Sequence, residues 1–276
     1  MNRLLPPAHL EAAAIVRTSK SSFVPAFRLL AADGRKDLET LYAFCRAADD
    51  IADAEGYEAT DRYAALEAWR AAFRDPDLRG LPDNLRHLIV RRDLDRNLFL
   101  ELLDGTATDL AAPVRMATRA DLDLYCHRVA GTVGRLCLPI FGANPERATA
   151  YAEILGRALQ YTNILRDTAS DLQCQRLYCP LDELTAAGLD PELFPSGAER
   201  YLVAFASEAD QLFEMAAHLE PPADARALRP ARIMASIYRA LLRKMQRDNL
   251  RVTEKRYRLS GPEKLFAVGR ALLVPQ

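Results

Sequence analysis

The stretch CRAADDIADAEG, residues 45–56, decides how the rest of the chain is interpreted. Its surroundings predict an amphipathic helix, in which Asp49 and Asp53 lie one turn apart on the apolar side. Asp50 projects roughly 100° away from them, beside Arg46. Like charges one turn apart repel each other weakly in water, and they cost much more in a protein interior unless they are paired. A helix end that faces solvent would also explain these acids.

A second stretch, ALQYTNILRDTASD at 158–171, repeats this pattern. Asn163, Asp167 and Asp171 recur at intervals of four residues and therefore form one line on a helix. Oxygen ligands suit hard cations, and Mg²⁺ typically takes one or two carboxylates and completes its shell with water and phosphate oxygens. Two such rows, facing each other with divalent ions between them, would form a clamp for a diphosphate. Their pairing favours this interpretation over two unrelated acidic helices.

The apolar periodicity is helical almost throughout, and strand-like alternation is absent. We therefore predict an all-α protein, a bundle of helices in a single domain that spans residues 1–276 with its core at about 19–272. Proline and glycine clusters mark the breaks between helices. The expected helices cover 22–32, 37–55, 60–74, 83–91, 93–104, 119–141, 145–173, 198–217, 230–249 and 261–272.

Composition narrows the function classes. The net charge of −1 gives no basic field for nucleic acid, and no apolar run is long enough to span a bilayer. The five cysteines form no CxxC pair, so we expect reduced thiols in an intracellular protein and no zinc site. The first twenty residues lack the apolar core of a signal peptide, and we expect a cytoplasmic location.

Several ordered blocks give the chain a family resemblance. It resembles the squalene/phytoene synthases, which join prenyl diphosphates head to head. Within that family its sequence motifs are most similar to those of the bacterial presqualene diphosphate synthases. The blocks are SKSSFVPAFRLL at 19–30, LYAFCRAADDIAD at 41–53, LYCHRVAGTVGRLCLPIFG at 124–142, ALQYTNILRDTASD at 158–171, RLYCP at 176–180 and RYRLSGPEKL at 256–265.

The resemblance implies an isoprenoid-synthase-type bundle around a central cavity. Two prenyl diphosphates, farnesyl diphosphate foremost, would condense there to presqualene diphosphate with release of diphosphate, as in hopanoid or squalene biosynthesis. The small residues Gly131, Thr132 and Gly134 would help to line a channel for the apolar tails. The implied cofactor is Mg²⁺, several ions of which would bind to Asp49, Asp53, Asn163, Asp167 and Asp171.

The resemblance also implies residues for the diphosphates and for proton transfer. Tyr178 and Tyr125 are candidate proton relays, Arg176 is a candidate catalytic cation, and the released diphosphate is another candidate base. The implied diphosphate-binding residues are Arg46, Ser21, Ser22, Tyr42, Gln160, Arg166 and Arg258.

Several of these residues have simpler alternative roles. Arg46 is spaced to pair with Asp50 on the helix surface, and Ser22 is equally suited to cap a helix. Tyr42 and Tyr125 could be ordinary core tyrosines. Arg166 could form a surface ion pair with the neighbouring Asp167.

The sequence departs from the usual motifs of the family at two places, and these departures put the rate of turnover and the identity of the product in doubt. Thr168, Ala169 and Ser170 stand where relatives often carry further acids, and Cys174 and Gln175 precede Arg176 where Arg-Gly is usual. Phytoene, dehydrosqualene or NADPH-dependent squalene formation therefore stays open, as does a non-catalytic assembly factor. A lipophilic product is also compatible with peripheral contact at the inner face of a membrane, and the sequence predicts no oligomeric state.

Overall fold

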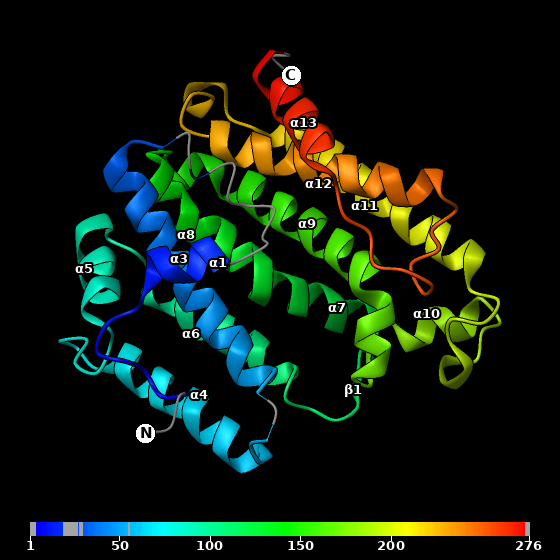
Figure 1. Ribbon diagram of the computed structural model, residues 1–276, viewed down its shortest axis with the longest axis horizontal. Coiled ribbons are helices and arrows are strands. Elements are labelled where there is room, and N and C mark those ends of the chain that lie inside the picture. The colour runs from blue at the N-terminus through cyan, green and yellow to red at the C-terminus, as the bar shows by residue number, and fades with distance from the viewer. Residues whose placement is uncertain (1–3, 19–26, 28–29, 55, 274–276) are drawn as a thin grey trace.

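Helices form nearly all the regular structure of the computed structural model, which describes residues 4–18, 27, 30–54 and 56–273 (Figure 1). The all-α prediction is confirmed. The elements are α1 (Ala12–Thr18), α3 (Ala32–Ala52), α4 (Ala59–Arg74), α5 (Asp83–Arg92), α6 (Arg96–Thr108), β1 (Val114–Arg115), α7 (Arg119–Cys126), the π-helical turn η1 (His127–Gly131), α8 (Thr132–Phe141), α9 (Pro145–Gln173), β2 (Arg176–Leu177), α10 (Leu181–Ala186), the 3₁₀ turn η2 (Pro191–Leu193), α11 (Glu199–Leu219), the 3₁₀ turn η3 (Pro222–Asp224), α12 (Arg229–Arg247) and α13 (Gly261–Leu273).

The long helix α9 crosses the middle of the molecule, with α3 to α6 on one side and α11 to α13 on the other (Figure 1). Its predicted limits, 145–173, are confirmed. The Asn144 side chain accepts a hydrogen bond of 3.1 Å from the Arg147 N–H and so caps the helix. Pro145 suits the first helical position because its missing N–H would have no partner there.

Helix α3 differs from its prediction in its limits. It begins at Ala32, five residues before the predicted position, and ends at Ala52. Its fully buried positions are Leu41, Phe44, Ala48 and Ile51. On the predicted apolar side, Leu38, Leu41, Ala48 and Ala52 are buried, whereas Tyr42 and Cys45 are partly buried and line a cavity. The acids that continue this side also face the cavity.

Other boundaries reflect local chemistry. The helix predicted at 93–104 begins at Arg96, because Asp93 adopts a left-handed conformation and Asp95 caps the new helix. The predicted helix 119–141 is interrupted by η1. The predicted helix 22–32 lies largely outside the described residues. The short helices α1 and α10 were not predicted.

A two-stranded parallel ladder was also missed, because two residues per strand are too few for a pattern. It pairs Val114 with Arg176 and Arg115 with Leu177. The ladder fixes the chain immediately after α9 against the segment that follows α6. It therefore sets the position of Arg176 at the end of the second acidic helix.

The apolar core consists of two clusters. One joins α1, α3, α4, α5 and α6, and the other joins α7, α9, α11 and α12. Side chains of both clusters line one cavity, which therefore lies between them. No helix in the described part of the chain is both long and apolar enough to cross a membrane.

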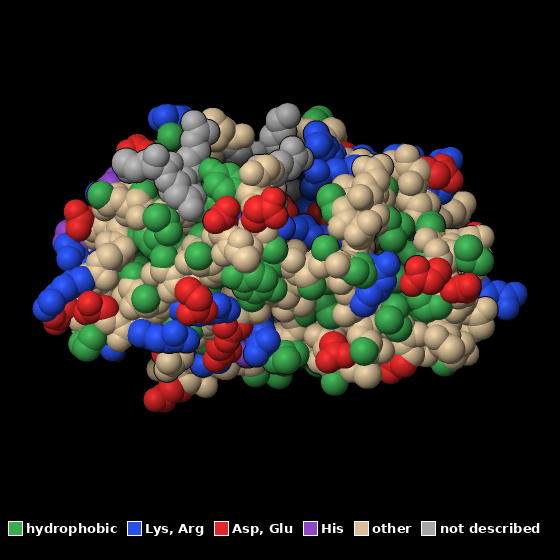
Figure 2. Space-filling view, turned by 90° about the horizontal axis from the view of Figure 1, so that it is seen from below, with side chains coloured by type: hydrophobic (Ala, Val, Ile, Leu, Met, Phe, Trp, Pro, Cys, Tyr) green, Lys and Arg blue, Asp and Glu red, His purple; other side chains and the backbone are tan. Residues whose placement is uncertain are grey.

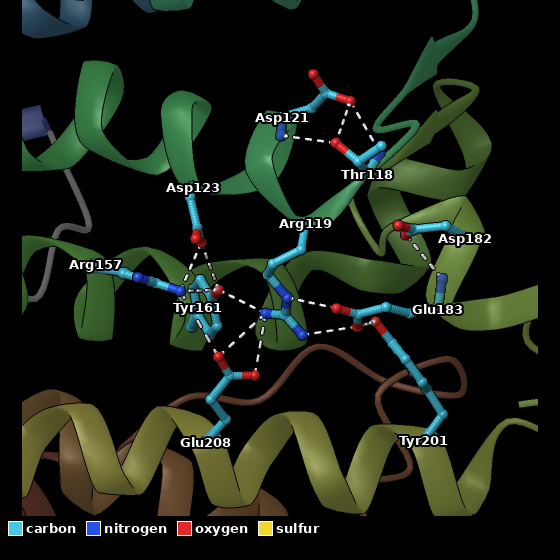
Figure 3. A network of polar contacts seen from close by, with 10 residues as sticks. All are labelled: Thr118, Arg119, Asp121, Asp123, Arg157, Tyr161, Asp182, Glu183, Tyr201 and Glu208. Carbon is cyan, nitrogen blue, oxygen red and sulfur yellow. Dashed lines mark hydrogen bonds and ion pairs between the residues drawn. The ribbon is translucent and has the colours of Figure 1, made fainter. Parts of the chain in front are cut away.

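Polar contacts fasten α9 to its neighbours on the side away from the cavity (Figure 3). The Arg119 guanidinium donates two hydrogen bonds to Glu183, at 2.6 and 2.7 Å, and a third to the Tyr161 hydroxyl at 2.7 Å. Arg157 pairs with Asp123 at 2.6 Å. These bonds join α7, α9 and α10, so the helix that carries the second acidic row is held from behind.

Glycine permits the close approach of α9 to the turn η1. A Cβ on Gly156 would lie 2.7 Å from the carbonyl oxygen of Ala130 and 2.9 Å from the Gly131 nitrogen, both backbone atoms. We predict that Gly156→Ala lowers the free energy of unfolding by about 1–3 kcal/mol, because the helices must separate. Chemical denaturation would measure this. Gly269→Ala is the matched control, since its Cβ meets nothing within 4 Å; equal stability changes in both variants would contradict the prediction.

Candidate active site

The cavity between the two clusters has a volume of about 1010 Å³. Acidic and basic side chains gather along the upper edge of the molecule in Figure 2, where the surface is hollowed. Ser21 and Ser22 lie outside the described residues. All other predicted site residues line the cavity: Tyr42, Arg46, Asp49, Asp53, Tyr125, Gln160, Asn163, Arg166, Asp167, Asp171, Arg176, Tyr178 and Arg258.

The acidic row of α3 faces the cavity, where Arg176 pairs with Asp53 and the charge of Arg46 partly offsets the raised pKa of Asp49. Surrounding protein reduces the hydration of Asp49, although its side chain is exposed at the mouth. Together with the carboxylates of Asp53 and Asp109, this raises the pKa of Asp49 to about 7. Asp50 also borders the cavity and pairs with Arg46 at 2.6 Å.

The row of α9 is partly neutralised by arginines. Asp167 accepts a hydrogen bond of 2.9 Å from Arg166 and pairs with Arg256 at 2.8 Å. One turn later, burial and the neighbouring Asp167 raise the pKa of Asp171 to about 7. At the other end of the row, the side-chain oxygen Oδ1 of Asn163 is buried and has no hydrogen-bond partner.

Arg176 connects the two acidic rows. Its guanidinium donates a hydrogen bond of 2.9 Å to Asp53 and a longer one, of 3.3 Å, to the carbonyl of Ala52. It also contributes positive charge near Asp171 and Asp109. The residue that follows α9 thus holds the end of α3, which keeps the two helix ends together at the cavity mouth.

Asp109 is a site residue that sequence reasoning missed. It follows α6 and accepts a hydrogen bond from each of two buried tyrosines, at 2.7 Å from Tyr178 and 3.0 Å from Tyr125. The two rings stack with centroids 4.9 Å apart. Burial raises the pKa of Asp109 to about 6. Its spacing from Leu102 and Thr106, which also line the cavity, was the only signal available in the sequence.

The structure shows the surroundings of the arginines for which alternative roles were considered. Arg46 forms the surface pair with Asp50, half-exposed, and also lines the cavity, so its predicted diphosphate-binding role stays a prediction. The ion pair suggested between Arg166 and Asp167 is present, but it lies in the cavity wall with both side chains only 18% exposed rather than on the surface. Arg256 was missed; the prediction selected its neighbour Arg258, which also lines the cavity.

Only one of the three small residues that were predicted to line the cavity does so. Gly134 lines the cavity as expected, and so does Gly156. Gly131 and Thr132 do not line it. A Cβ on Gly131 would meet the Glu153 carboxylate, and Thr132 is fully buried. The π-helical turn rotates these residues away from the cavity.

The acidic rows fit magnesium ions. The side-chain oxygen of Asn163 has no hydrogen-bond partner, and the pKa values of Asp49 and Asp171 are raised. A bound cation would stabilise all three groups. No group of three or more His, Cys, Asp or Glu side chains is placed to hold a metal by itself among the described residues. Each ion would therefore need oxygens from a substrate as well, which is the usual coordination of Mg²⁺.

Comparisons with known proteins show the family of the chain. The squalene/phytoene synthase family matches residues 16–263. The presqualene diphosphate synthase of Zymomonas mobilis is 36% identical over 240 residues, which cover 84% of this chain and 82% of that protein. The phytoene synthase of Thermus thermophilus is 40% identical over 187 residues, 66% of this chain and 63% of that protein. A dehydrosqualene synthase crystallised with a ligand aligns with a TM-score of 0.82 at 25% identity and covers 95% of this chain and 94% of its own.

Proposed function

Because the chain belongs to the squalene/phytoene synthase family, we propose that it condenses two farnesyl diphosphates head to head into presqualene diphosphate. Diphosphate and one proton are released. The observation that carries this proposal is the pair of oxygen-ligand rows at the mouth of a deep, mostly apolar cavity. Its volume of about 1010 Å³ lies at the upper end of the range for cavities that hold one small molecule. It therefore has room for two long apolar chains.

The acidic rows would hold Mg²⁺ and, through it, the diphosphates. When bound, Mg²⁺ supplies positive charge that stabilises the leaving diphosphate without proton transfer. Arg176 and Arg166 lie beside the rows and bind the remaining phosphate oxygens. The further diphosphate-binding residues that we propose are Arg46, Ser21, Ser22, Tyr42, Gln160 and Arg258.

Apolar side chains protect the allylic cation that remains after diphosphate departs. Leu41, Val133 and Leu159 belong to the cavity wall and offer no nucleophile. Exclusion of water from this region prevents quenching, so the double bond of the second prenyl chain can attack the cation.

The pair of tyrosines is suited to remove the proton that closes the cyclopropane ring. Burial raises the pKa of both Tyr125 and Tyr178, so neither is a phenolate at neutral pH. A neutral tyrosine can instead accept the substrate proton at its oxygen while its own proton passes to the Asp109 carboxylate. The released diphosphate is the alternative base.

A product assay tests the proposal. The purified protein is incubated with farnesyl diphosphate and Mg²⁺, with and without NADPH, and the extracts are analysed by mass spectrometry. We expect presqualene diphosphate without NADPH and none from Asp167→Ala. Squalene only with NADPH, or conversion only of geranylgeranyl diphosphate, would assign the chain to a sister activity. Turnover of no prenyl diphosphate would favour the non-catalytic alternative.

A further inference from the structure

The outward face of α13 is apolar and unpartnered in the described structure. Leu265 is 73% exposed, Phe266 is 75% exposed and Leu272 is 50% exposed. The opposite side of the same helix is packed: Ala267 is buried, and its carbonyl accepts a hydrogen bond of 2.8 Å from the Ser236 hydroxyl of α12. The helix is thus fastened to the protein while its large apolar side chains point outward.

No charged residue interrupts this face. A Cβ added at Gly261 or Gly269 would meet nothing within 4 Å, so the space above both positions is open. Val90 and Leu193, which are 72% and 65% exposed, occur singly on other elements, and the exposed apolar residues of α11 are at most 57% exposed. Helical periodicity places the following residues on the outward face: Gly261, Pro262, Leu265, Phe266, Gly269 and Leu272.

Basic residues flank the face on one side. Burial and the neighbouring guanidinium groups of Arg239, Arg270 and Arg247 lower the pKa of Arg243, so these cations lie close together. Arg239 is paired with Asp210 and Glu214. The other three arginines make no hydrogen bond or ion pair with any residue that the structure describes. Arg270 follows Phe266 by one turn, so the unpaired cations border the apolar face.

The face also adjoins the cavity. Lys264 of the same helix and Leu259 just before it both line the cavity. A surface that docks α13 would therefore lie against a helix that forms part of the cavity wall.

We propose that the outward face of α13 docks on a lipid bilayer that carries anionic headgroups. Leu265, Phe266 and Leu272 enter the boundary between headgroups and acyl chains, and the unpaired arginines bind lipid phosphates. A second protein surface would satisfy the apolar side chains equally well. A lipid surface is favoured because its phosphates also supply partners for the arginines that form no hydrogen bond or ion pair within the described chain. Asp210, whose charge acts on Arg243, is already paired with Arg239.

Vesicle sedimentation with the full chain tests this inference without reference to turnover. We expect binding to phosphatidylcholine vesicles that contain phosphatidylglycerol, weaker binding at high salt and little binding to phosphatidylcholine alone. The double variant Leu265→Ser/Phe266→Ser should lower the partition coefficient about tenfold or more. Val90→Ser, which changes an equally exposed side chain on α5, should leave it unchanged.

A gain-of-binding pair excludes misfolding as the explanation. Gly269→Leu and Gly269→Glu both replace a helical glycine at an open position, so both should stabilise the helix. Only the leucine adds apolar surface to the face. We expect Gly269→Leu to bind anionic vesicles more tightly than wild type and Gly269→Glu to bind them more weakly.

Substituting the arginines should change the preference for anionic lipid rather than the apolar contribution to binding. Arg243→Gln combined with Arg270→Gln should remove the preference for anionic over neutral vesicles while thermal stability is retained. Equal vesicle binding by the two Gly269 variants would overturn the proposal. So would a double serine variant that binds vesicles like wild type but has a lower molar mass in light scattering, since the face would then join two copies of this chain.

Discussion

Replacing Asp49 by Asn is expected to lower turnover by about 10³-fold and to stabilise the metal-free protein above neutral pH. Asp49 has a raised pKa of about 7 in the folded protein against 3.8 for the free group. Such a raised pKa adds stability below about pH 4 that is lost as the pH rises through 7, because the folded protein must then ionise a poorly hydrated carboxylate. Asn carries no charge at any pH, so the variant avoids this loss.

Thermal melts without metal at pH 5 and pH 8 measure the effect. The melting temperature of Asp49→Asn should exceed that of wild type at pH 8, and the difference should shrink at pH 5. Glu39→Gln is the matched control, since Glu39 lies on the same helix but does not line the cavity. A difference that is independent of pH would argue against a poorly hydrated carboxylate at position 49.

Added ligands should reverse the order of stability. Mg²⁺ with inorganic diphosphate should raise the melting temperature of wild type, because the folded state binds them, and should raise that of Asp49→Asn much less. We expect kcat to fall by about 10³-fold, as for loss of one strong electrostatic contact in other active sites. Wild-type turnover by the variant, or an equal ligand shift, would remove Asp49 from the metal site.

The rows of acids could be predicted from the sequence because each is encoded within one helix. Asp49 and Asp53 are separated by one turn, and so are Asn163 and Asp167, so helical periodicity alone places each pair on one face. The apolar neighbours of each row then indicate which face borders the core. The family resemblance supplied the remaining step, which is that the two rows face each other across a cavity.

The rest of the site depends on contacts between distant segments. Asp109 meets Tyr178 across 69 residues of sequence, and neither position has a periodic pattern that points to the other. The pair between Arg256 and Asp167 joins a loop to a helix in the same way. The turn η1 was missed for another reason: an extra residue in a helical turn leaves no mark on the apolar pattern but rotates Gly131 away from the cavity.

The second large effect is expected at Asp109, where Asp109→Ala should lower kcat by about 10²-fold. The substitution removes the acceptor of two buried hydroxyl groups, those of Tyr125 and Tyr178. Each unsatisfied group also costs about 1–3 kcal/mol of stability. Asp109→Asn keeps one carbonyl oxygen as acceptor and should lose less of both activity and stability. KM for farnesyl diphosphate should change little, because the Asp109 carboxylate accepts hydrogen bonds from the tyrosines, whereas Arg176 donates to the backbone carbonyl of Asp109, which the substitution keeps.

Double variants separate a positioning role from metal binding. If Asp109 acts through the tyrosines, Asp109→Asn should add little to the loss already caused by Tyr125→Phe combined with Tyr178→Phe, since residues that share one network are not additive. If Asp109 instead binds Mg²⁺, its loss should raise the Mg²⁺ concentration needed for half-maximal activity, and the effects should add. Additive losses with a changed Mg²⁺ requirement would therefore move Asp109 from the tyrosine network into the metal site. An unchanged Mg²⁺ requirement with non-additive losses would identify it as the group that orients both hydroxyls and receives their proton.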